Sequence, residues 1–212
     1  LWMFGASKMA EVIKRGHDLH CKFVADSRGL TYEAVFEAYK AGDPEITQAR
    51  QVAKGVLYGL PGGLGSASLV QYLKGNGTTI TLEQADGLRA QYLKSWPEMD
   101  LYYKNASEQT KYGSACIVHP VSRRQRGGLS FTQVLNTPFQ GLVSDGAKSA
   151  LWQVCRETMV GSGILKNSRV CLFLHDEIML ETPTPEAEAA GKELSRIMIE
   201  AMQRYIPDLP IR

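Results

Sequence analysis

Three adjacent ionisable residues interrupt an apolar segment toward the C-terminal end of the sequence. His175, Asp176 and Glu177 follow Val-Cys-Leu-Phe-Leu at 170–174 and precede Ile-Met-Leu at 178–180. Because unpaired charges are costly to bury, two β-prone segments joined in this way predict a tight hairpin with the charges at its tip. Such a tip can present carboxylates to Mg²⁺, a hard cation that is often shared with a phosphate-bearing substrate. A surface hairpin with an ordinary polar turn is the alternative.

A second pattern follows a helix start at Asp43-Pro44, where Asp can cap the helix and Pro occupies its first position. Arg50, Lys54 and Tyr58 then recur at four-residue spacing, which places them on one slowly drifting stripe of the predicted helix. Two cations followed by an aromatic ring suit a nucleoside triphosphate, since cations hold phosphates and a ring packs against sugar or base. An ordinary solvated basic face is the alternative.

A third pattern is the segment Asn-Thr-Pro-Phe-Gln-Gly at 136–141, which precedes a predicted helix at 142–159. The side chains of Asn136 and Gln140 can donate and accept hydrogen bonds at base edges and sugars in a DNA minor groove. Ordinary loop chemistry around a proline accounts for the same residues.

In this order and at these separations, the three segments resemble the family A DNA polymerases, the group of bacterial polymerase I and several phage replicases. Arg50, Lys54 and Tyr58 match the family's motif B on its mobile fingers helix. The resemblance implies that Arg50 and Lys54 hold the incoming deoxynucleoside triphosphate, with Lys54 also a candidate general acid for the pyrophosphate leaving group. It implies that Tyr58 packs at the sugar, and Tyr rather than Phe there implies tolerance of dideoxynucleotides.

The hairpin tip resembles the family's motif C. The resemblance implies that Asp176 is a ligand of two catalytic Mg²⁺ ions. It implies that Glu177 is either a helper ligand or a group that supports the ligands from behind, and that His175 either contacts the primer terminus or fixes the turn. Asn136 and Gln140 match the family's Asn-x-Pro-x-Gln-Gly segment, which contacts the primer–template minor groove near the growing end.

Two weaker likenesses agree with this assignment. Asp18-Leu19-His20 resembles the Asp-Ile-His that follows the first palm helix of the family. Ser122-Arg123-Arg124 resembles a Gly-Arg-Arg before the minor-groove helix, which implies that Arg123 and Arg124 contact primer–template DNA.

The family's motif A, Asp-x-Ser-x-x-Glu-Leu, is the main departure, because it should precede Asp18 and is absent from the sequence. Internal aspartates such as Asp145 are interpreted as solvated surface residues rather than as replacements. We expect the missing aspartate to come from a second polypeptide, which would also carry the thumb and any exonuclease domain, or from a missing N-terminal region. The isolated chain is then expected to be inactive.

Two further departures concern the DNA contacts. Gly62 stands where the family commonly has a second Tyr, and Thr132 stands where it has an Arg. Pro61 and its neighbouring glycines predict that the helix ends within a turn of Tyr58. Template-side stacking and primer contacts should therefore differ from the family pattern. The Leu-Pro-Gly-Gly turn at 60–63 is phage-like.

Composition restricts the setting without revealing the function. A formal net charge of +2 is too small to indicate nucleic-acid binding, so cations must be placed locally. The four cysteines lack zinc or disulfide spacing, which favours a reducing compartment, and no apolar run is long enough for a bilayer. These features predict no membrane association and a cytoplasmic location, in a bacterial host if the chain is phage-encoded.

The predicted fold class is α+β, a right-hand polymerase fragment with helical fingers followed by part of an antiparallel-sheet palm. Residues 1–127 are assigned mainly to fingers, with the end of a palm helix at the N-terminus, and residues 128–212 to a partial palm with the motif C hairpin. Besides that hairpin and the helix at 142–159, the patterns predict helices near 2–16, 31–41, 44–58, 67–74, 81–96, 98–112 and 185–205, and strands near 115–119 and 130–135.

The predicted function is templated 5′-to-3′ addition of deoxynucleotides to a primer, with primer–template DNA and deoxynucleoside triphosphates as partners and two Mg²⁺ ions as cofactors. A non-catalytic nucleic-acid-binding module derived from a polymerase is the alternative. A metal nuclease built on Asp176 and Glu177 would leave the Arg50–Lys54–Tyr58 stripe unexplained.

Overall fold

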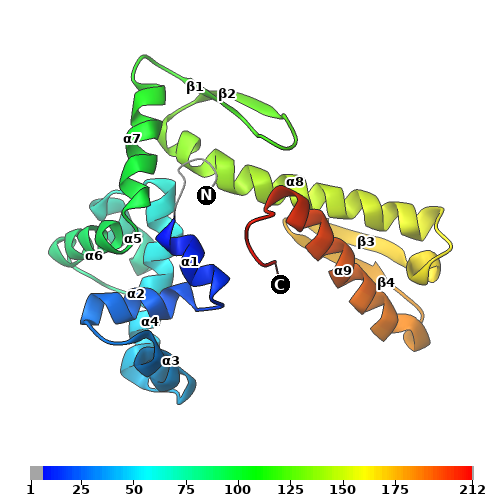
Figure 1. Ribbon diagram of the computed structural model, residues 1–212, viewed down its shortest axis with the longest axis horizontal. Coiled ribbons are helices and arrows are strands. Elements are labelled where there is room, and N and C mark those ends of the chain that lie inside the picture. Colours follow the sequence, from blue (N-terminus) through cyan, green and yellow to red (C-terminus); the bar gives the residue numbers. More distant parts are fainter. Residues whose placement is uncertain (1–6, 212) are drawn as a thin grey trace. The chain divides into compact units, whose positions relative to one another are not determined.

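A computed structural model describes residues 7–211, which form two compact units (Figure 1). The first unit comprises residues up to 117 together with 126–136, and the second comprises 118–125 together with 137 onward. The long helix α8 (Phe131–Met159) therefore contributes to both units. Helices dominate and the strands are few, so the predicted α+β class is confirmed.

Helices make up most of the first unit, and local side-chain caps explain where several of them begin. Asp18, Thr31, Asp43 and Thr81 each accept a hydrogen bond from the backbone N–H three residues later. At Thr81 the side chain of Gln84 completes a capping box. The helices and turn are α1 (Lys8–Lys14), α2 (Leu19–Arg28), α3 (Tyr32–Lys40), α4 (Pro44–Gly59), η1 (Leu60–Gly62), α5 (Ser66–Gly75), α6 (Leu82–Ser95) and α7 (Glu98–Thr110).

Helix α4 is central to the first unit, since it packs against α2, α3, α5 and α6. At the contact with α5, a Cβ on Gly55 would lie 2.3 Å from a methyl carbon of Leu73, so only glycine permits this approach. The helix ends at Gly59 and passes through η1 to Gly63, whose φ of +86° is left-handed. The predicted end of the helix close to Tyr58 is confirmed.

A short hairpin, β1 (Ala115–Val118) and β2 (Gln125–Leu129), precedes α8. The predicted strand at 130–135 is wrong, because α8 begins at Phe131 and residues 131–135 are helical. The side chain of Gln133 accepts hydrogen bonds from the backbone N–H and hydroxyl of Ser130, which favours a helix start at this point. The segment 136–141 consequently lies within a helix that contains Pro138, rather than in a loop before one.

The second unit contains the predicted motif C hairpin. Strands β3 (Arg169–Leu174) and β4 (Glu177–Glu181) pair antiparallel with Leu174 opposite Glu177, so His175 and Asp176 form a two-residue turn. One face of the hairpin packs on α8 and α9 (Ala187–Tyr205), as Figure 1 shows. The short turns η2 (Ile164–Asn167) and η3 (Thr184–Glu186) flank the strands. The buried core of this unit is Ala150, Val154, Leu165, Ile178, Ala190, Ile197 and Ala201.

The N-terminal helices differ from those that the sequence predicts. Helix α2 was not predicted, and the helix predicted at 2–16 is described only as Lys8–Lys14, since residues 1–6 lie outside the described part. Within residues 7–211, no helix has the length and apolar character that crossing a bilayer requires.

Candidate nucleotide and DNA sites

The predicted triphosphate residues all lie on α4 in the first unit. Lys54 is exposed, and its ammonium nitrogen lies 5.8 Å from the ring centroid of Tyr58, which is 62% exposed. His20, from the first turn of α2, meets the ring of Tyr58 edge-on at a centroid distance of 6.0 Å. The structure therefore brings the Asp18-Leu19-His20 segment and the α4 stripe together, although at least thirty residues separate them in the sequence.

Arg50 is the most constrained member of this group. Its Nη2 donates to a carboxylate oxygen of Asp18 at 2.6 Å and lies 3.5 Å from Nδ1 of His20. The guanidinium carbon lies 4.5 Å from the ring centroid of Tyr39 on α3. The hydrogen bond to Asp18 raises the pKa of Arg50 above its usual value, so the side chain stays cationic. Its Nε is buried without a hydrogen-bond partner.

Asp18 is the anion that balances this site. Burial disfavours its charged form, but hydrogen bonds from His20, Arg50 and the backbone N–H of Cys21 outweigh burial and hold its pKa well below the usual range. The adjacent Cys21 is fully buried, and burial together with the charge of Asp18 raises the pKa of its thiol to about 11. An ionised Asp18 and a neutral Cys21 thiol are the states that this geometry favours.

The motif C residues lie in the second unit at the exposed tip of the β3–β4 hairpin. His175 has a φ of +55°, which lies in the left-handed region that favours glycine. A positive φ is strained for a residue other than glycine, so His175 occupies this turn at some cost to the stability of the hairpin. Asp176 and Glu177 are both exposed.

The donor chemistry at this tip suits Mg²⁺ in part. Asp176 and Glu177 supply the carboxylate oxygens that Mg²⁺ takes, and Mg²⁺ sites often use only one or two carboxylates together with substrate phosphates. However, residues 7–211 contain no cluster of three or more His, Cys, Asp or Glu side chains able to hold a metal ion. A complete site therefore needs oxygen ligands beyond those that the described residues gather.

Arg123 and Arg124 lie in the loop between β1 and β2, which belongs to the second unit. Arg124 donates to the carboxylate of Asp145 at 3.0 Å and to the carbonyl of Gly141 at 3.2 Å, and Ser122 donates to the other oxygen of Asp145 at 2.6 Å. Asp145 is only 7% exposed, so its interpretation as a solvated surface residue is wrong. Its burial among these donors anchors the loop to α8.

His119 also holds the β1–β2 loop against α8. Its ring is 2% exposed and lies against Gly141, where an added Cβ would be 2.0 Å from Cε1 of the ring. Burial lowers the pKa of His119, assisted by the charge of Arg124 and opposed by that of Asp145. With the loop held in this way, Arg123 adopts a left-handed φ of +59° and its side chain is exposed.

The two predicted minor-groove residues differ in their surroundings. Gln140 is exposed on α8, whereas the amide nitrogen of Asn136 donates to the carbonyls of Thr132 at 2.8 Å and Gly62 at 3.3 Å. A Cβ on Gly62 would lie 2.9 Å from the Asn136 side chain. The backbone carbonyls of Gly62 and Thr132, the two positions that depart from the family pattern, thus both accept hydrogen bonds from the side-chain amide of Asn136.

Three residues that help to form the candidate sites could not be assigned from the sequence: Tyr39, His119 and Asp145. Tyr39 falls three residues after Phe36 and seven after Tyr32 on a helix whose aromatic face was visible in the sequence. Nothing in the sequence pointed to His119 or Asp145, because the β1–β2 loop and α8, which bring each of them to its partners, lie about twenty residues apart in the chain.

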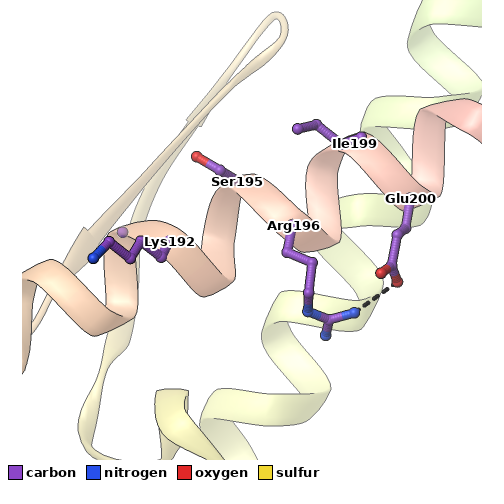
Figure 2. Close-up of a pocket in the computed structure, with 6 residues that line it drawn as sticks. Lys192, Ser195, Arg196, Ile199 and Glu200 are labelled. Carbon is purple, nitrogen blue, oxygen red and sulfur yellow. Dashed lines mark hydrogen bonds and ion pairs between the residues drawn. The ribbon is translucent and has the colours of Figure 1, made fainter. Parts of the chain in front are cut away.

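A hollow of about 550 Å³ on the surface of α9 contains none of the predicted site residues. Figure 2 shows that its lining comes from a single helix, with Arg196 paired to Glu200 at 2.7 Å. Arg196 also pairs with Glu193, and these two carboxylates raise its pKa. We interpret this surface as a solvated helix face.

Comparison with known proteins identifies the family. The model of DNA polymerase family A matches residues 3–211, which is nearly the whole chain. The chain belongs to DNA polymerase family A. The resemblance inferred from the three motifs is therefore confirmed at the level of the family.

Similar family A proteins come from bacteria and from a phage. DNA polymerase I of Aquifex aeolicus (strain VF5) is 25% identical over 204 residues, which cover 96% of this chain and 33% of that protein. The DNA polymerase of Bacillus phage SP01 is 22% identical over 216 residues, covering 95% of this chain and 22% of that protein. These relatives extend far beyond the region that they share with this chain.

The fold is also similar to that of a solved family A structure. The POL domain of Pol1 from M. smegmatis, in complex with DNA primer-template and dNTP, superimposes with a TM-score of 0.69 and 26% sequence identity. The match covers 96% of this chain and 34% of that chain. This chain thus spans about a third or less of the relatives with which it is compared.

Proposed function

We propose that this chain is the nucleotide-binding and motif C portion of a DNA-directed DNA polymerase that adds deoxynucleotides to a primer 5′ to 3′. The observation that carries the proposal is the family match over residues 3–211 combined with the stripe on α4, where Lys54 and Tyr58 are exposed and Arg50 is half-buried. A nucleic-acid-binding module without chemistry would have no use for a triphosphate clamp alongside motif C.

In the first unit, Arg50 and Lys54 are assigned to the triphosphate and Tyr58 to the sugar. Lys54 is exposed on the flexible stem of a lysine side chain, and its three N–H donors also make it a candidate general acid for the leaving pyrophosphate. Arg50 remains a fixed charge because its pKa is raised, so we assign it to binding rather than to proton transfer.

In the second unit, Asp176 is assigned as metal ligand and Glu177 as helper ligand. Two Mg²⁺ ions, held together with substrate phosphates, would supply Lewis-acid activation of the primer hydroxyl and would stabilise charge on the transferring phosphoryl group. His175, fixed in a strained turn, is assigned to the primer terminus. Arg123, Arg124, Asn136 and Gln140 are assigned to primer–template DNA.

A motif A aspartate from outside these residues is part of the proposal, either from a second polypeptide or from a longer form of this chain. The outward face of the β3–β4 hairpin supports the presence of a further segment, because three apolar side chains are exposed there. Leu172, Leu174 and Met179 are 47%, 51% and 58% exposed. A two-stranded sheet with one apolar face open to water is poorly stabilised alone, so a further segment covering that face is expected.

The test is Mg²⁺-dependent primer extension by the assembly purified untagged from its source. Native mass spectrometry of the same sample distinguishes a separate companion polypeptide from a single longer chain. Template-directed incorporation by either assembly supports the proposal. An assembly that binds primer–template tightly but incorporates no nucleotide with Mg²⁺ present would instead favour the non-catalytic binding module.

A further inference from the structure

Arg50 is held from two directions by residues of two other helices. Asp18, at the N-cap of α2, takes Nη2 of the guanidinium, and the ring of Tyr39 on α3 lies 4.5 Å from its central carbon. The hydrogen bond to the carboxylate of Asp18 fixes one nitrogen of the guanidinium. The ring of Tyr39, which lies against the guanidinium, restricts rotation of the group about that bond. The Arg50 side chain is 18% exposed, so part of it still faces solvent.

Helix α3 is itself tied to Asp18. The hydroxyl of Tyr32, at the first position of α3, accepts a hydrogen bond from the backbone N–H of Asp18 at 3.0 Å. Its ring stacks on His17 with a centroid distance of 3.9 Å and an interplanar angle of 4°. Because Tyr32 and Tyr39 are seven residues apart, they lie on the same face of the helix. One face of α3 therefore contacts both Asp18, through Tyr32, and Arg50, through Tyr39.

We propose that Tyr39 is a positioning residue that orients Arg50 for the triphosphate, so that α3 sets the affinity for the incoming nucleotide. The inference rests on the proposed function, in which Arg50 binds that triphosphate. Without the ring, Arg50 keeps its charge and its bond to Asp18 but gains rotational freedom that nucleotide binding must then remove. Removal of the ring should therefore weaken binding of the nucleotide and have little effect on the rate of the chemical step.

The test measures binding of Mg²⁺–tripolyphosphate to the full chain, and KM and kcat for a deoxynucleotide with the native assembly. Tyr39→Leu and Tyr39→Met remove the ring, the latter with little loss of side-chain length, and Tyr39→Phe keeps it. The matched control is Tyr112→Leu, which breaks a cation–π pair of the same kind with Lys111 on the exposed surface of the same unit. Circular dichroism and the unfolding midpoint establish that each variant is folded.

We expect Tyr39→Leu and Tyr39→Met to weaken tripolyphosphate binding about 3- to 10-fold and to raise KM similarly, with kcat nearly unchanged. Tyr39→Phe and Tyr112→Leu should behave as the wild type. Adding Tyr39→Leu to Arg50→Ala should cause no further loss, because the ring acts through Arg50.

Two outcomes overturn the inference and separate it from the proposed function. If Arg50→Ala weakens binding while folded Tyr39→Leu and Tyr39→Met bind as the wild type, the positioning role is wrong and the triphosphate role of Arg50 stands. If Arg50→Ala binds tripolyphosphate and incorporates nucleotide as the wild type, the assignment of Arg50 fails and the inference fails with it.

Discussion

Substitution of Gly141 by Ala should destabilise the wild-type protein and yet stabilise a protein that lacks the His119 ring. In the native structure a Cβ at position 141 would lie 2.0 Å from Cε1 and 2.3 Å from Nε2 of His119. Ordinary contacts between carbon atoms are about 3.5–4.0 Å, so the buried ring must move by more than an ångström or the helix must shift. Overpacking of this kind costs about 1–3 kcal/mol, and the severity of the overlap favours the upper end.

Helix propensity and the space left by removal of the His119 ring decide whether Gly141→Ala stabilises or destabilises the protein. Exchange of Gly for Ala inside a helix gains about 1 kcal/mol from helix propensity, which leaves a net loss of about 2 kcal/mol for Gly141→Ala in the wild type. His119→Ala alone should cost about 2–3 kcal/mol, because it empties a space that is 2% exposed. In that background the added methyl has room, so Gly141→Ala should stabilise by up to about 1 kcal/mol.

The assay is urea-induced unfolding of the four members of this cycle, followed by circular dichroism and analysed for the free energy of unfolding. The two single variants and the double variant yield the coupling between the residues directly. Additive effects, with Gly141→Ala equally destabilising in both backgrounds, would refute the packing of the β1–β2 loop on α8. A destabilised single variant should also bind primer–template DNA more weakly, because Arg123 and Arg124 lie in the displaced loop.

Three other predictions follow from local geometry. His175→Gly should raise the free energy of unfolding by about 0.5–1 kcal/mol relative to His175→Ala, since only glycine relieves the positive φ; equal stabilities would remove the claim of strain. With a native assembly, Tyr58→Phe should increase discrimination against dideoxynucleotides in competitive incorporation, and an unchanged ratio would place Tyr58 away from the sugar. Cys21 should alkylate far more slowly than exposed Cys116 and Cys171 at mildly alkaline pH, as mass spectrometry of iodoacetamide adducts would show.

The raised pKa of Cys21 also has a consequence for stability. The folded thiol holds its proton up to about pH 11, whereas an unfolded thiol loses it near its ordinary value of about 8.5. Between these values the folded state binds more protons, so the contribution of Cys21 to stability is full below the lower pH and declines as the pH rises. Cys21→Ala should flatten the decline in stability between pH 9 and 11, and an unchanged slope would contradict the assignment.

Sequence reasoning worked well where local chemistry decides the structure. The helix start at Asp43-Pro44 is a local pattern of a capping side chain followed by proline, and α4 begins where that pattern predicts. The β3–β4 hairpin followed from the placement of His175 and Asp176 between apolar runs, which leaves few other ways to keep the carboxylate in water.

Prediction failed where distant parts of the chain decide the structure. A strand is predicted at 130–135, but Val134 and Leu135 lie in α8, where both are buried in the core of the first unit. Asp145 was read as a solvated residue because its partners Ser122 and Arg124 lie more than twenty positions earlier. Likewise, the stacking of Tyr39 on Arg50 depends on how α3 packs against α4, which no local pattern specifies.

The central claim is that the carboxylate at the tip of the β3–β4 hairpin serves nucleotidyl transfer. The most direct test is single-nucleotide incorporation by the native assembly with Asp176→Asn, which removes the charge and keeps the size of the side chain. We expect the rate to fall on the order of 10²–10³-fold or more while primer–template affinity stays nearly unchanged. Incorporation at the wild-type rate by a folded Asp176→Asn assembly would contradict the account.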